Sequence, residues 1–169
     1  DRAIHQLSLI GYSWGSAICG RYAGEFESKV SRLVLSGALW VEKGATPRTI
    51  SADIGAYRTV DAGSMAKRWA TGLSGDEIDA IVPPARVSRW CSDTVLVDPI
   101  GDKSGLLRAP TGVLKDFMNY SHTGEPWYKP REILAPTQVV VGELDKETTP
   151  EQARKVFEQL GNAHEKRLT

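Results

Sequence analysis

The sequence is poor in the residues on which several kinds of protein depend. It holds two cysteines and three histidines in 169 residues, and Cys19 and Cys91 suggest neither a disulfide framework nor a metal site. Lysine plus arginine and aspartate plus glutamate both number 21. With that balance and no basic stripe among aromatic residues, no nucleic-acid partner is expected. No apolar run is long enough to span a membrane.

What the sequence does have is an apolar strand that runs into a serine flanked by glycines. Residues 7–15 read LSLIGYSWG, and a run of small residues that predicts a helix follows. The two glycines permit a turn sharp enough to hold Ser13 in a strained conformation, with its hydroxyl above the sheet. Because the helix begins beside Ser13, its first N–H groups point to where an oxyanion would form. The pattern predicts Ser13 as a nucleophile and the Trp14 N–H as an oxyanion-hole donor.

Two plainer interpretations of this turn are a packing turn and a phosphate-binding loop. A glycine-rich turn between strand and helix can serve packing alone. A phosphate-binding loop would need a Gly-Lys-Ser or Gly-Lys-Thr sequence, which does not follow here. The strand, the glycines, the small-residue helix and an acid further along the chain agree with each other and favour the nucleophile.

Three segments together resemble the α/β-hydrolase family. They are the G-x-S-x-G turn at 11–15, residues 31–37 (SRLVLSG), which look like the next parallel strand, and residues 136–145 (PTQVVVGELD), which look like a later strand and the loop that carries the triad acid. The resemblance implies an α/β fold, here a partial α/β-hydrolase sheet of mostly parallel strands with an inserted, mainly helical cap. It also implies a serine hydrolase of the esterase kind that needs neither a metal nor an organic cofactor.

Asp145 stands at the position of the family's triad acid. Serine before acid is the chain order that the family requires. The strand is expected at 137–142, and Thr149-Pro150 should start a helix through Leu160 because proline suits the first helical position. Glu143, closer to the strand end, is the alternative acid, and an aspartate in a turn can also serve only its own backbone.

The family requires a histidine after that acid, and none of the three fits. His164 precedes residues 165–168, which resemble one more strand, so it should enter the parallel sheet at the end opposite Ser13. His5 starts the nucleophile strand at that same end. His122 is expected to be an ordinary loop residue near the return from cap to sheet, although it could reach the pocket.

The family's missing parts lead to an expectation about the chain as a whole. The catalytic histidine is expected beyond Thr169 and the second oxyanion donor before Asp1. The chain therefore looks like an internal fragment, with flanking segments of a parent enzyme as its partners. Its localisation stays open, with the cytoplasm slightly favoured.

A long central segment separates the two parts of the predicted core. We expect core at 1–39 and 132–169, and a helical cap at 40–131, because the connection is too long for two neighbouring strands. Ser74 and Glu77 form a capping-box pattern ahead of one helix. Further helices are expected at 86–91 and 110–120.

The remaining residues of the cap have structural interpretations. Asp98 and Asp102 are expected in a loop, beside Pro99 and Gly101. Five aromatic residues could line a pocket, but in a small helical subdomain such residues more often form its own core: Trp69, Trp90, Tyr120, Trp127 and Tyr128.

The resemblance implies the hydrolysis of a small-molecule carboxylic ester or lactone through an acyl-enzyme on Ser13. A serine at this turn argues against the dehalogenase and epoxide-hydrolase branches, which carry an aspartate. A proline-iminopeptidase-like activity and the hydrolysis of carbon–carbon bonds remain alternatives within the family. A non-catalytic ligand-binding protein of the same fold is the alternative from another class. Without its histidine, the isolated chain is expected to be nearly inactive.

Overall fold

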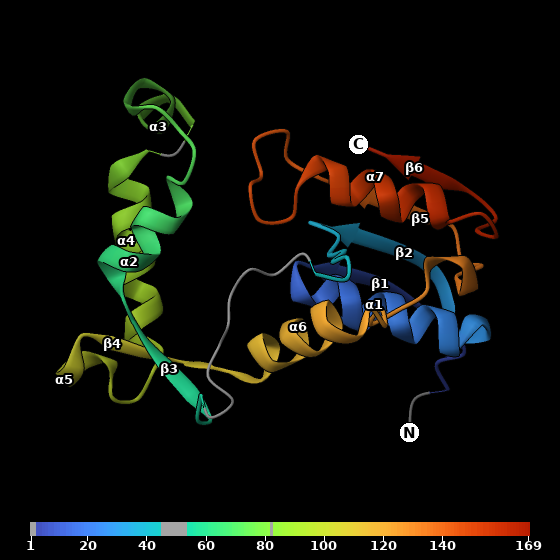
Figure 1. Ribbon diagram of the computed structural model, residues 1–169, viewed down its shortest axis with the longest axis horizontal. Helices are drawn as coiled ribbons and strands as arrows, with labels where there is room; N and C mark the ends of the chain where they lie inside the picture. Colours follow the sequence, from blue (N-terminus) through green and yellow to red (C-terminus); the bar gives the residue numbers. More distant parts are fainter. Residues whose placement is uncertain (1–2, 45–53, 82) are drawn as a thin grey trace. The chain divides into compact units, whose positions relative to one another are not determined.

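The computed structural model describes residues 3–44, 54–81 and 83–169. The chain divides into two compact units, Asp1–Arg48 together with Asp116–Thr169, and Thr49–Lys115. Figure 1 shows that the second unit is one continuous stretch of chain, whereas the first is assembled from both ends of the sequence.

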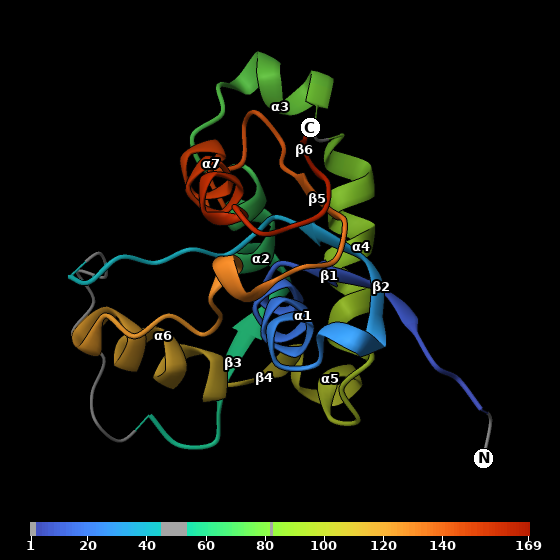
Figure 2. The same cartoon turned by 90° about the vertical axis from the view of Figure 1, so that its right-hand side faces the viewer.

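The first unit, which we call the sheet unit, is built on four parallel strands in the order β1-β2-β5-β6. Figure 2 shows helices α1 and α7 on the same side of this sheet, as right-handed crossovers in one direction require. Its elements are β1 (Leu7–Tyr12), α1 (Trp14–Glu25), η1 (Glu27–Lys29), β2 (Val30–Ser36), η2 (Pro130–Glu132), β5 (Thr137–Val140), α7 (Pro150–Gln159) and β6 (Lys166–Leu168), with α6 (Gly112–Thr123) leading into it.

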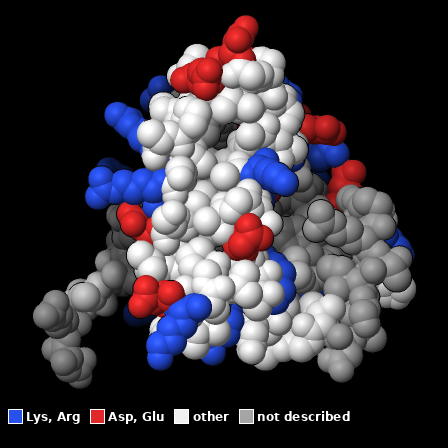
Figure 3. All heavy atoms as spheres, turned by 90° about the vertical axis from the view of Figure 1, so that its left-hand side faces the viewer, with Lys and Arg blue, Asp and Glu red and all other residues white. Residues whose placement is uncertain are grey.

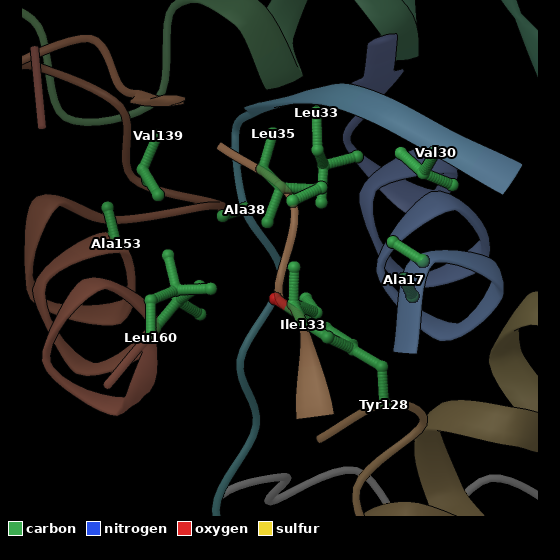
Figure 4. Packing of buried hydrophobic residues seen from close by; sticks show 13 residues of the cluster. Ala17, Val30, Leu33, Leu35, Ala38, Tyr128, Ile133, Val139, Ala153 and Leu160 are labelled. Atoms are coloured by element: carbon green, nitrogen blue, oxygen red, sulfur yellow. The ribbon is translucent and has the colours of Figure 1, made fainter. Parts of the chain in front are cut away.

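The core of the sheet unit lies between the strands and these two helices. Leu33 and Leu35 of β2 face Leu160 and the buried side of α7 (Figure 4). Helix α1 can come close because its buried residues are small, and a Cβ on Gly20 would lie only 2.6 Å from the ring of Tyr128. The family's alternation of strand and helix thus arises from apolar strands and a small-residue helix face.

Most of the expected elements of this unit are confirmed. The strand predicted at 137–142 is shorter, because the chain leaves the sheet after Val140 and turns at Gly142, whose carbonyl accepts from the Asp145 N–H at 3.1 Å. Pro150 is the first residue of α7, and the Thr149 hydroxyl accepts from the Gln152 N–H at 3.3 Å. This helix start follows from proline geometry and side-chain capping.

The second unit, which we call the helical unit, combines helices with a two-stranded antiparallel sheet, β3 with β4. The predicted capping box is present, since the Ser74 N–H donates to Glu77 Oε2 at 2.8 Å and the Glu77 N–H donates to Ser74 Oγ at 3.4 Å. The elements are β3 (Tyr57–Asp61), α2 (Ala62–Trp69), α3 (Gly75–Ile81), α4 (Pro84–Leu96), α5 (Gly101–Ser104) and β4 (Leu106–Pro110).

Several expectations for this region need correction. The helix predicted at 86–91 extends over Pro84–Leu96, and the one predicted at 110–120 begins only at Gly112, because Pro110 ends β4. The expected loop at Gly101 and Asp102 forms the short helix α5. The compact unit Thr49–Lys115 lies inside the segment predicted as a cap, 40–131, and the cap itself stays a prediction. Residues 45–53 of that segment lie outside the described residues.

The surface carries charges of both signs. On the face drawn in Figure 3, lysine and arginine are interspersed with aspartate and glutamate among uncharged side chains, and no stripe of one sign gathers there. In the part of the chain that the structure describes, no helix has both the length and the apolar character needed to cross a bilayer.

Candidate functional site

Ser13 occupies the sharp turn between β1 and α1. Its φ is 51° and its ψ is −119°, and among the described residues it alone has a positive φ without being glycine. A conformation of this kind costs about 1–3 kcal/mol and persists only where the surroundings impose it. Here the Ser13 N–H donates to the Ser36 carbonyl at 2.8 Å, which fixes the turn against the end of β2.

The two glycines of the motif contribute unequally to this turn. A Cβ on Gly11 would collide with the carbonyl oxygen of Gly15 and lie 2.8 Å from the Ser16 Cα, so the close approach of strand and helix requires glycine there. A Cβ on Gly15 would meet nothing within 4 Å in the part of the chain that is described. The sharp turn therefore depends on Gly11, and the described contacts give no packing reason for Gly15.

Ser16 is one of the small residues that follow the G-x-S-x-G turn, and its hydroxyl is part of that turn. The side chain is fully buried, and its Oγ donates to the Ser13 carbonyl at 2.6 Å while accepting from the Leu39 N–H at 3.0 Å. The hydroxyl thus links the backbone of Ser13 to the loop that follows β2. The sequence signal was a polar residue among the small residues of a helix face predicted to be buried.

Asp145 lies in the loop after β5, half-buried, and its carboxylate accepts three hydrogen bonds. Its Oδ1 accepts from the Glu147 N–H at 2.8 Å and the Thr148 N–H at 2.9 Å, and its Oδ2 accepts from Thr148 Oγ1 at 2.7 Å. Glu143, the alternative acid, is exposed, and no hydrogen bond within the described residues uses its side chain. The carboxylate of Asp145 is thus held in place by hydrogen bonds, whereas the described residues give the carboxylate of Glu143 none.

The sheet brings the serine and the aspartate to the same edge. Tyr12, just before Ser13, pairs with Ser36, and Ser36 pairs with Val140 of the strand that leads to Asp145. The carboxyl ends of β1, β2 and β5 are therefore level, and β2 separates the serine from the acid. In open parallel sheets, this edge is where binding and catalytic sites form.

None of the three histidines is brought to this pair. His5 precedes β1, and His164 stands just before β6, so both lie toward the amino ends of the strands, opposite the edge that carries Ser13. His122 is in the last turn of α6. All three are exposed, and no hydrogen bond between described residues joins any of them to Ser13 or Asp145.

Trp14 presents its backbone and its ring differently. As the first residue of α1 its N–H has no acceptor within the helix, and no bond within 3–44, 54–81 and 83–169 engages it. The indole packs edge-on against Trp127, with ring centroids 4.7 Å apart, and lies 5.9 Å from Phe117. The ring is anchored, while the N–H beside Ser13 is left available.

Of the five aromatic residues that the sequence left undecided, Trp127 packs against Trp14, and the other four form two groups. Tyr120 and Tyr128 are buried in the sheet unit, where Tyr128 donates its hydroxyl to the Leu39 carbonyl at 3.2 Å. Burial and the charge of Glu42 raise the pKa of Tyr120 to about 12, so this phenol stays protonated at neutral pH. Trp69 and Trp90 form a T-shaped pair in the helical unit, with centroids 5.2 Å apart.

The two aspartates expected in a loop of this region, Asp98 and Asp102, have different surroundings. Asp98 is buried and ion-paired with Arg108 at 2.7 Å, and the hydrogen bonds from Arg108 hold the pKa of this carboxyl well below its usual range. Asp102 is exposed on α5. Within the described ranges, no group of three or more histidine, cysteine, aspartate or glutamate side chains is placed to hold a metal ion.

Comparisons with known proteins agree with this architecture. The pattern of the family described as "alpha/beta hydrolase fold" matches residues 3–168. The monoacylglycerol lipase of Paleococcus ferrophilus is similar with a TM-score of 0.56 and 22% identity, over 98% of this chain and 58% of that one. An N-acyl homoserine lactone degrading enzyme gives 0.56 and 17%, over 98% and 60%. A meta-cleavage product hydrolase from Pseudomonas fluorescens gives 0.56 and 15%, over 98% and 56%.

The low sequence identities limit these similarities to evidence about the fold. At 15–22% identity they show the fold, and the chain spans only 56–60% of the length of those three structures. No curated protein matches the sequence.

Proposed function

The chain belongs to the α/β-hydrolase fold family, and from that premise we propose that it carries the nucleophile and the acid of a serine hydrolase that cleaves carboxylic esters or lactones. The observation that supports this most directly is the strained backbone of Ser13. A serine held at φ 51° between a strand and a helix presents its hydroxyl at the edge of the sheet where the carboxyl ends of β1, β2 and β5 lie. Such strain is typical of a nucleophile and serves no evident packing purpose.

In the proposed reaction, Ser13 Oγ attacks the acyl carbon while a histidine takes the hydroxyl proton. The negative charge that forms on the acyl oxygen is stabilised by the Trp14 N–H and by the positive end of α1. The histidine returns its proton to the leaving alcohol. A water molecule, deprotonated by the same histidine, then attacks the acyl-enzyme, and Ser13 is regenerated as the acid departs.

Asp145 would hold the histidine in the productive tautomer and stabilise the imidazolium ion. Its three hydrogen bonds fix the carboxylate at the same edge as Ser13. The histidines at 5, 122 and 164 are not joined to this pair by any hydrogen bond between described residues, and the proposed base is a histidine other than these three.

The groups at the site favour one class of substrate, carboxylic esters and lactones. An oxygen nucleophile, one free N–H donor and a held carboxylate suit acyl transfer to water. A carboxylic ester or a lactone presents the same reacting group, and the two differ only in whether the alcohol leaves.

The test compares the complete natural protein with its Ser13→Ala variant on p-nitrophenyl acetate. Wild-type protein should turn over the ester, and the variant should lose about 10⁴-fold or more in kcat while keeping its fold. A fluorophosphonate probe should label the wild type at Ser13 and leave the variant unlabelled. Turnover that survives the substitution would contradict the proposal. Binding of acyl ligands without any turnover would favour the non-catalytic alternative.

A further inference from the structure

The acid loop contains a buried hydroxyl to which the proposed mechanism gives no role. Thr148 is 5% exposed, and its Oγ1 donates to Asp145 Oδ2 at 2.7 Å while its own N–H donates to Oδ1 at 2.9 Å. Thr148 therefore donates a hydrogen bond to each of the two carboxylate oxygens of Asp145. Backbone donors alone would restrain Oδ1 and leave the carboxylate free to rotate.

The same hydroxyl is seated against the loop that follows β2. Gly37 has a φ of 58°, and a Cβ there would lie 2.8 Å from Thr148 Oγ1 and 3.8 Å from the Ser13 nitrogen. The Gly37 N–H donates to the Val140 carbonyl at 2.9 Å, and the Ser36 carbonyl accepts from Ser13. Residues 36 and 37 thus contact the nucleophile turn on one side and the acid loop on the other.

We propose that Thr148 is a positioning residue, which orients the Asp145 carboxylate and, seated against Gly37, sets its place relative to Ser13. This rests on the proposed function, because orientation matters only if Asp145 pairs with a histidine. The hydroxyl occupies one lone pair of Oδ2, and the other lone pair of that oxygen stays open to the base. A small misplacement of a catalytic group can cost about 100-fold in rate.

The experiment uses the complete natural protein and three substitutions. Thr148→Val removes the hydroxyl at nearly constant volume, and Thr148→Ser retains it. Thr137→Val is the matched control, because Thr137 is 3% exposed and its Oγ1 donates to the Ala135 carbonyl at 2.8 Å, away from Asp145. All three are compared with wild type and Ser13→Ala for kcat and KM on p-nitrophenyl acetate.

Thr148→Val should lower kcat about 10- to 100-fold with KM within about twofold of wild type, because the bound substrate is not touched. Thr148→Ser should restore most of kcat, and Thr137→Val should leave it unchanged. Equal kcat values for Thr148→Val and Thr137→Val would overturn the role of Thr148, and so would a Thr148→Ser variant as slow as Thr148→Val. In either case, an inactive Ser13→Ala variant would still support the proposed function. A fully active Ser13→Ala would overturn both.

Discussion

Ser13 is held in its turn by its neighbours rather than by its own preference. Three groups fix its backbone: the Ser36 carbonyl, the Ser16 N–H and the Ser16 hydroxyl. Each bond alone is worth about 0.5–1.5 kcal/mol, so together they can offset the strain of a positive φ. The sequence predicted the strain from the glycines, but it did not predict the serine hydroxyl that holds it.

Ser16→Ala should show how much this anchor matters to stability. The change removes two hydrogen bonds and leaves the Leu39 N–H, on a residue that is 5% exposed, without its acceptor. We expect a loss of about 1–3 kcal/mol in the free energy of unfolding, measured in urea. Ser8→Ala, at an exposed hydroxyl bonded to Ser31, should change it by less than about 0.5 kcal/mol. An equal loss of unfolding free energy in Ser16→Ala and Ser8→Ala would argue against a stabilising role of the Ser16 hydroxyl.

Asp145→Asn tests the acid in the complete protein. An amide cannot fix the histidine in the tautomer that accepts the Ser13 proton, so kcat should fall on the order of 10⁴-fold, by analogy with the serine-protease triad. The matched variant Glu143→Gln alters an exposed carboxylate two residues earlier and should leave kcat unchanged. An active Asp145→Asn together with an inactive Glu143→Gln would move the role to Glu143.

At the scale of elements, sequence patterns succeeded where burial and capping are local and regular. The strands at 7–12 and 30–36 and the helix after Thr149 follow from apolar runs, glycines and a capped proline. Strands β3 and β4 gave no such signal, because none of their residues is buried. Their pairing depends on partners about fifty residues apart, which periodicity within one strand cannot reveal.

The pairing of Asp98 with Arg108 joins the turn after α4 to β4 in the helical unit. Since the pKa of the Asp98 carboxyl is lowered in the folded state, its stabilising contribution is present above the unfolded pKa of about 3.9. That contribution is lost as pH falls through the folded pKa.

Asp98→Asn should therefore lower the unfolding midpoint at pH 7, and the difference from wild type should shrink as the pH is taken well below 3.9. Thermal unfolding followed by circular dichroism at pH 7 and at low pH measures the midpoints of the variant and of the wild type. Asp93→Asn, which weakens an exposed pair with Arg89 at 3.6 Å, is the control and should have little effect at either pH. A pH-independent difference for Asp98→Asn would mean that packing, not charge, is responsible.

At the scale of the whole molecule, the chain combines a sheet unit that carries Ser13 and Asp145 with a separate helical unit. The residues for the proposed reaction could be predicted because the family's motifs place them at strand ends. The buried hydroxyls of Ser16 and Thr148 could not, since serine and threonine are ordinary surface residues and only the fold shows which ones are enclosed. The boundaries of a cap are a further property that composition does not determine.

The prediction that residues 40–131 form a cap can be tested by substrate choice: that segment should govern which substrate is accepted, whereas Ser13 and Asp145 should govern whether reaction occurs. Trp69 and Trp90 are the test positions in this segment, because these large apolar residues are about half exposed, at 50% and 48%. Each apolar contact to a substrate changes discrimination by about 1–3 kcal/mol. Trp90→Leu in the complete protein should therefore alter the ratio of kcat/KM between short and bulky esters. Arg89→Leu on the same helix should leave that ratio unchanged, and a Trp90→Leu variant that slows every ester by one common factor would contradict the assignment.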